Sequence, residues 1–151
     1  MPMMNVKPIK LCLFYCVNSL DANMLRQSLN EMGEMGTDEL TAISLPCSGK
    51  VNLLYLLKAF EKGADGVMLI TCRQGECKFL EGNLRAQKRG ESVAGILEEI
   101  GLGKGRMRVV RKESEGGIQQ IIEEMKSLRE SIRNQRQETM KWNTRVALQA
   151  R

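Results

Sequence analysis

The chain has 151 residues, 42% of them hydrophobic, which is enough for a domain of ordinary size to bury a core without disulfides. It contains no histidine, so Ser-His-Asp and Cys-His catalysis, histidine-ligated zinc and Rieske-type clusters are excluded. The formal net charge is +5, and residues 129–151 carry +4 of it, from six basic and two acidic side chains.

The hydrophobic pattern also indicates in which cellular compartment the protein is to be expected. Because no run of about 18 apolar residues occurs, we expect no membrane insertion. The short apolar run at residues 9–15 lacks a small-residue cleavage site after it, which disfavours a signal peptide. We therefore expect a cytoplasmic protein, in which clustered cysteines bind a metal or do redox chemistry more often than they form structural disulfides.

Strands and helices are predicted to alternate along the chain. Short apolar runs predict strands at residues 9–15, 40–45, 66–71 and, more weakly, 106–112. Helical spacing and capping residues predict helices at about residues 21–35, 48–63, 83–100 and 118–132. This alternation predicts an α/β fold with a parallel sheet, and four strands favour a small doubly wound, flavodoxin-like arrangement followed by a C-terminal helical arm.

Two of these helices have a clear inner face. In the second helix, which we expect to open at Ser48-Gly49, the residues at helical spacing are Val51, Leu54, Leu57 and Phe60. In the last helix the apolar stripe consists of Ile118, Ile121, Ile122, Met125, Leu128 and Ile132.

All five cysteines lie in the first 77 residues, and four of them follow predicted strands. Cys16 follows the first strand, Cys47 the second, and Cys72 and Cys77 the third. Because the carboxyl ends of parallel strands share one edge, where such sheets bind ligands, these four thiols are expected to meet there. Cys12 lies inside the first strand, where a cysteine most often serves as a small core residue.

Four thiols at one edge are compatible with several chemistries. An iron–sulfur cluster fits the four ligands, the absence of histidine and the loop placement, and one close pair with two distant cysteines resembles a [2Fe–2S] site. A structural zinc tetrathiolate is the main alternative, although only Cys72-x4-Cys77 has a suitable spacing. A redox-active Cys72–Cys77 disulfide, whose spacing departs from C-x-x-C, and inert thiols are the remaining alternatives.

Basic residues gather around the third loop and the helix after it: Arg73, Lys78, Arg85, Lys88 and Arg89. Such cations would favour the reduced form of an anionic cluster, although Lys88 and Arg89 fit a solvated helix face at least as well. Gly75 and Gly82 would let the backbone pass close to sulfur.

Three segments resemble the delta subunit of methyl-viologen-reducing hydrogenase: PCSGKV at 46–51, LKAFEKGADGVMLITC at 57–72 and CRQGECKFLEGNLRAQKR at 72–89. YCVNS at 15–19 resembles the first cysteine segment of that family less closely. The resemblance covers about residues 9–130 and implies one [2Fe–2S] cluster held by Cys16, Cys47, Cys72 and Cys77. Family members often have His or Pro in the Cys72–Cys77 loop, where this chain has Arg73 and Gln74.

The resemblance also implies a non-catalytic role in electron transfer. Such a protein relays electrons between a partner oxidoreductase, of hydrogenase, formate dehydrogenase or methylenetetrahydrofolate reductase type, and the flavin subunit of a heterodisulfide reductase-like, electron-bifurcating complex. From the residues alone, a zinc-stabilised interaction module is the rival hypothesis.

We expect two regions, a cluster-binding domain at residues 1–131 and a basic arm at residues 132–151. The arm contains the single tryptophan of the chain, Trp142, and Trp and Arg are enriched at binding hot spots. We therefore expect it to dock on a partner subunit rather than pack back on its own domain or fray. Nucleic-acid binding is not expected, because neither an aromatic platform nor a groove-binding motif accompanies the charge.

Overall fold

A computed structural model describes residues 7–17, 19–32, 36, 38–72, 82–112 and 117–150. Within these ranges the chain forms a parallel sheet of four strands, β1 (Lys10–Cys16), β2 (Glu39–Leu45), β3 (Gly66–Thr71) and β4 (Met107–Arg111). The strand order is β2-β1-β3-β4, which corresponds to the first four positions of the flavodoxin-like order. The predicted α/β fold is confirmed.

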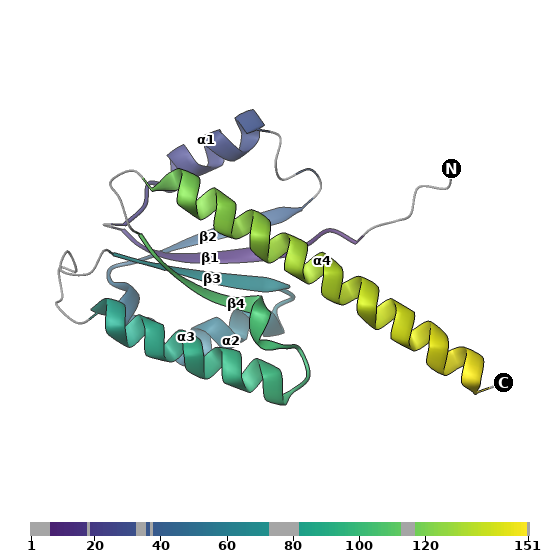
Figure 1. The fold of residues 1–151 in the computed structure, drawn as a ribbon. Helices are drawn as coiled ribbons and strands as arrows, with labels where there is room; N and C mark the ends of the chain where they lie inside the picture. The colour runs from purple at the N-terminus through teal and green to yellow at the C-terminus, as the bar shows by residue number, and fades with distance from the viewer. Residues whose placement is uncertain are drawn as a thin grey trace.

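Helices cover both faces of the sheet (Figure 1). They are α1 (Ala22–Met32), α2 (Leu53–Glu61), α3 (Gly82–Glu99) and α4 (Ile118–Gln149), with short 3-10 turns at η1 (Ser48–Lys50) and η2 (Lys104–Arg106). Alternate residues of β1 enter opposite cores: Leu11 and Leu13 pack with α1 and α4, whereas Cys12 and Phe14 pack with α2 and α3. All six residues of β3 are buried, as expected for an interior strand covered on both faces.

The predicted start of the second helix was wrong by several residues. Ser48–Lys50 forms the turn η1, and α2 begins only at Leu53, because the Asn52 side chain caps it by accepting a hydrogen bond from the Leu54 backbone N–H at 2.9 Å. This later start buries Leu56 completely and leaves Leu54 66% exposed, so Leu54 is not part of the inner face.

The first part of α4 is fastened to the amino-terminal edge of the sheet by two aspartates. Asp38, just before β2, has its Oδ2 atom 2.6 Å from Arg129 Nη2 and 2.7 Å from Arg133 Nη2. Asp65, just before β3, has its Oδ1 atom 3.0 Å from Arg136 Nη2. Half of the six basic residues in 129–151 therefore bind their own domain.

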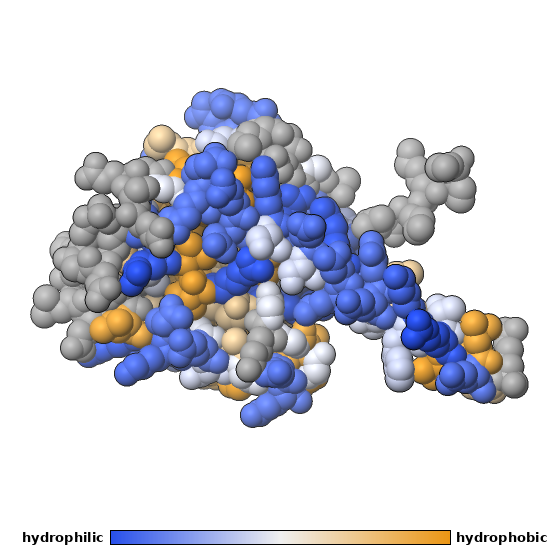
Figure 2. Space-filling view, viewed as in Figure 1, coloured by the Kyte–Doolittle hydropathy of each residue, from blue (hydrophilic) through white to orange (hydrophobic). Residues whose placement is uncertain are grey.

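Beyond Arg136, α4 continues as a single helix that leaves the domain (Figure 1). Residues 137–150 are all exposed, and apolar side chains gather near the far end of this helix (Figure 2). The large ones are Met140, Trp142, Val146 and Leu148. The expected boundary between residues 131 and 132 lies inside α4, next to its last buried residue, Ile132. Among the described residues, no helix has the length and apolarity needed to cross a bilayer.

Candidate metal centre

Three of the four predicted ligand cysteines are described, and all three lie at the carboxyl edge of the sheet. Cys16 is the last residue of β1, Cys47 lies two residues after β2, and Cys72 directly follows β3. The three strands are neighbours in the sheet, so their ends converge. Each of these cysteines is buried, with 3%, 2% and 6% of its surface exposed, respectively. The fourth predicted ligand, Cys77, lies outside the described residues.

Cys16 and Cys72 are in contact through their sulfur atoms. The Cys72 Sγ to Cys16 Sγ distance is 3.5 Å. Two thiolates bound to one tetrahedral ion through metal–sulfur bonds of about 2.3 Å lie about 3.8 Å apart. The pair therefore fits two coordination positions on a single iron or zinc ion.

Cys47 lies on the loop that follows β2, next to the strand that ends at Cys16. Cys16 Sγ contacts the carbonyl oxygen of Pro46 at 3.9 Å, which places the first thiol against the loop that carries Cys47. Within the described ranges, no three cysteine or acidic side chains converge on a point where they could hold one ion. The described thiols thus form a close pair with a third thiol on the adjacent loop.

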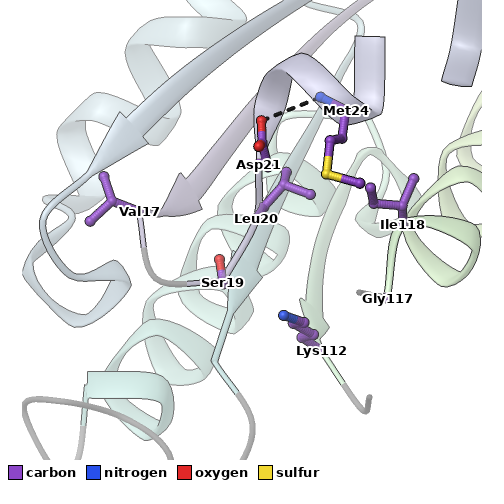
Figure 3. Close-up of a pocket in the computed structure, with 8 residues that line it drawn as sticks. All are labelled: Val17, Ser19, Leu20, Asp21, Met24, Lys112, Gly117 and Ile118. Atoms are coloured by element: carbon purple, nitrogen blue, oxygen red, sulfur yellow. Dashed lines mark hydrogen bonds between the residues drawn. The ribbon is translucent and has the colours of Figure 1, made fainter. Parts of the chain in front are cut away.

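The loop after Cys16 is braced by short-range hydrogen bonds. Ser19 Oγ donates to the Cys16 carbonyl oxygen at 2.7 Å. Asp21 Oδ1 accepts from the backbone N–H groups of Asn23 and Met24, which caps the start of α1, and Figure 3 shows the bond to Met24. An open pocket of about 290 Å³ lies between this loop and the start of α4. Its lining residues are Val17, Ser19, Leu20, Asp21, Met24, Lys112, Gly117 and Ile118 (Figure 3). No motif in the sequence indicated this pocket.

Cys12 belongs to the core, and its burial there favours the protonated thiol over the thiolate. It is 7% exposed and packs among the apolar residues between the sheet and the helices α2 and α3. Burial raises the pKa of the Cys12 thiol from 9.0 to about 11, because an apolar environment disfavours the thiolate. The prediction that Cys12 is a core residue is confirmed.

The basic residues predicted near the site fall into three groups. Arg73 and Lys78, like Gly75, lie outside the described residues. Arg85 and Lys88 are exposed on α3. Arg89 is half-buried, and its Nη1 atom donates to the backbone carbonyls of Gly49 and Val51, on the loop after Cys47. The interpretation of Arg89 as part of a solvated helix face was therefore wrong, and no motif in the sequence indicated its contact with this loop.

Comparisons with known proteins point to one family. Residues 11–134 match the family model described as methyl-viologen-reducing hydrogenase, delta subunit. The chain is 43% identical over 65 residues to the vhu iron–sulfur subunit of an F420-non-reducing hydrogenase from Methanocaldococcus jannaschii, a match covering 43% of this chain and 48% of that protein. It is 41% identical over 68 residues to the corresponding protein from Methanococcus maripaludis, covering 45% and 51%.

A second kind of relative is much longer. The chain is 31% identical over 99 residues to one subunit of the ferredoxin/F(420)H(2)-dependent CoB-CoM heterodisulfide reductase of Methanosarcina acetivorans, a match covering 66% of this chain and 11% of that protein. The chain spans about half the length of the hydrogenase iron–sulfur proteins it matches and a small part of the reductase polypeptide.

Proposed function

The chain belongs to the family of the delta subunit of methyl-viologen-reducing hydrogenase, and we propose that it is a cytoplasmic, non-catalytic electron-transfer subunit carrying one [2Fe–2S] cluster. The observation that carries the proposal is the buried Cys16–Cys72 pair, with sulfur atoms 3.5 Å apart, at the sheet edge of a chain whose relatives are named iron–sulfur subunits. When bound, the cluster would accept and release one electron at a time.

We propose Cys16, Cys47, Cys72 and Cys77 as the four ligands. Cys16 and Cys72 would supply both thiolates of one iron, because their separation suits a shared tetrahedral ion. Cys47 and Cys77 would supply those of the other iron. Cys47 follows the neighbouring strand β2, and Cys16 Sγ contacts the carbonyl oxygen of the preceding residue, Pro46, at 3.9 Å. Burial of the three described ligands limits the access of water and of external oxidants to the sulfur atoms.

The proposed partners follow from the two kinds of relatives. One is a hydrogenase, a formate dehydrogenase or a methylenetetrahydrofolate reductase-type enzyme that exchanges electrons with the cluster, and the named hydrogenase proteins support the first of these. The other is the flavin subunit of a heterodisulfide reductase-like, electron-bifurcating complex. The similar stretch of the Methanosarcina acetivorans protein is part of a much longer polypeptide of such a reductase, so a segment of this kind occurs there fused to other regions.

We further propose that the arm, residues 132–151, contributes to docking, whereas residues 1–131 form the cluster domain. The part of the arm from Gln137 to Ala150 is exposed along its whole length and leaves Trp142 65% exposed. Large exposed apolar side chains on a helix that projects from the domain are typical of an interface for another protein.

Anaerobic purification tests the central proposal. The protein should be brown and contain about two iron atoms and two inorganic sulfides per chain, as a [2Fe–2S] cluster requires. Its visible absorbance should bleach on reduction, and the reduced protein should give an EPR signal. Colourless protein with one zinc ion per chain would overturn the proposal in favour of the zinc interaction module.

A further inference from the structure

We propose that Arg89 is a positioning residue for Cys47, and that it holds the loop carrying this cysteine against the first turns of α3. Part of this inference rests on the proposed function, because it concerns how the chain places one of the proposed ligands. The hydrogen bonds of Arg89 and a backbone contact between two glycines both support it.

The Arg89 guanidinium reaches across to the Cys47 loop from a distant part of the chain. Its Nη1 atom donates to the Val51 carbonyl oxygen at 2.7 Å and to the Gly49 carbonyl oxygen, a contact that spans 40 positions in the sequence. These carbonyls lie two and four residues after Cys47. The turn η1 directly follows the cysteine, and the Lys50 backbone N–H donates to the Cys47 carbonyl oxygen at 3.0 Å. The guanidinium thus fixes the backbone directly beyond the thiol.

A short 3-10 turn makes few hydrogen bonds of its own, so it depends on such outside donors for a fixed geometry. Arg89 is suited to this task because its planar guanidinium carries several N–H donors. Without it, the carbonyls of Gly49 and Val51 would lose a charged donor, and the loop would gain conformational freedom.

The same loop is pressed against the start of α3 by a contact that only glycine permits. A Cβ atom added to Gly49 would lie 2.3 Å from Gly82 Cα and 2.6 Å from the Gly82 carbonyl oxygen. Because both clashing atoms belong to the backbone, no side-chain rotation could relieve them. Gly82 is the first residue of α3 and follows Cys77 by five positions in the sequence. The contact therefore joins the Cys47 loop to the end of the segment that carries Cys77.

The test compares Arg89→Gln and Arg89→Lys with Lys88→Gln, a control that removes an exposed charge from the adjacent position of α3. In the full-length chain after metal chelation, alkylation of each cysteine by iodoacetamide is followed by mass spectrometry. We expect Cys47 in Arg89→Gln to react about tenfold faster than in the wild type, because the loop loses hydrogen bonds to a charged donor. Cys12, in the core, should react at its wild-type rate, and Lys88→Gln should match the wild type throughout.

The metal-loaded proteins supply a second measurement. Arg89→Gln should give EPR g-values different from those of the wild type and lose iron faster to a chelator, with Arg89→Lys between the two. Unchanged Cys47 alkylation with unchanged g-values would overturn the positioning role. Faster alkylation of Cys12 and Cys47 alike would also overturn it, because general loosening of the domain would then explain the effect. A wild-type protein without iron would refute the proposed function. The alkylation rates would still test whether Arg89 positions the Cys47 loop.

Discussion

Arg129 Nη2 lies 2.6 Å from Asp38 Oδ2, and both side chains are almost fully buried. Arg129 Nε donates to the same oxygen at 2.9 Å, while Asp38 Oδ1 accepts from the Ile9 backbone N–H at 2.8 Å. The pair spans 91 positions of the sequence. It therefore connects α4 with the segment before β2 and with the entry to β1, and it fixes where the last helix lies on the sheet.

Replacing Asp38 by asparagine should destabilise the fold strongly. The substitution removes the carboxylate charge that the buried Arg129 guanidinium contacts at 2.6 Å, and removing one partner of a buried ion pair costs about 3–5 kcal/mol. Urea unfolding of the purified protein would measure this loss as a lower midpoint. Glu124→Gln is the matched control, because the Arg108–Glu124 pair, at 3.2 Å, is partly exposed and such pairs contribute about 1 kcal/mol or less. Equal midpoints for Asp38→Asn and the wild type would contradict the importance of the Asp38–Arg129 pair.

Two glycines of α3 should respond oppositely to alanine. A Cβ atom at Gly90 would lie 2.1 Å from Val109 Cγ2, whereas one at Gly95 would have no atom within 4 Å. Valine is stiff at χ1, so Gly90→Ala should force β4 and α3 apart and lower the thermal midpoint. Gly95→Ala should stabilise the protein by up to about 1 kcal/mol, because alanine favours the helix. If Gly90→Ala unfolded at or above the wild-type midpoint, close packing of α3 on β4 would be refuted.

The positions of the cysteines could be predicted from the sequence, whereas the contacts of the basic residues could not. The positions of Cys16, Cys47 and Cys72 at one edge could be predicted, because parallel strands always bring their carboxyl ends together. Arg129 could not be recognised as buried, because its partner Asp38 is remote in sequence and both look like surface charges. Folding thus leaves a smaller exposed charge on residues 129–151 than their composition suggests.

The start of α2 and the role of Arg89 were missed for a related reason. The apolar spacing after Cys47 suits a helix from Ser48, but the Asn52 cap places the first helical residue at Leu53. The intervening η1 turn is then held from outside by Arg89. Spacing alone does not reveal a contact made by a residue on another helix.

The buried thiol of Cys12 should make stability fall at alkaline pH. Its pKa is raised from 9.0 to about 11, so between these values the folded protein retains a proton that the unfolded chain releases. The folded state then binds more protons, and the free energy of unfolding decreases as the pH rises through this window. Wild type and Cys12→Ala should therefore be compared at about pH 8 and about pH 10.5, and the wild type should lose more stability than the variant. Equal losses of stability in the wild type and in Cys12→Ala would contradict the raised pKa of Cys12.

Trp142→Ser should weaken the proposed association with the partner proteins without affecting the fold. Trp142 is 65% exposed and makes no contribution to either core cluster, and Trp and Ser have similar helix propensities. Anaerobic co-purification from the native host should recover the hydrogenase-type and heterodisulfide reductase-type partners with the wild type and much less of them with the variant. Asn143→Ser, which changes an exposed neighbour, should behave as the wild type. Undiminished recovery with Trp142→Ser would exclude this side chain as an anchor.

Cys47 and Cys12 form a matched pair for testing the ligand set. Both thiols are buried, with 2% and 7% exposed, but Cys47 lies at the carboxyl edge of the sheet and Cys12 lies inside β1. Under the proposed function, Cys47→Ser replaces a soft thiolate ligand by a hydroxyl that binds iron poorly, so the cluster should be lost or its EPR signal changed. Cys12→Ala removes only a small core group and should leave the iron content and spectrum intact. An unchanged spectrum in Cys47→Ser would remove Cys47 from the proposed ligands. A perturbed spectrum in Cys12→Ala would indicate that Cys12 contributes to the cluster site, which its position in the core does not explain.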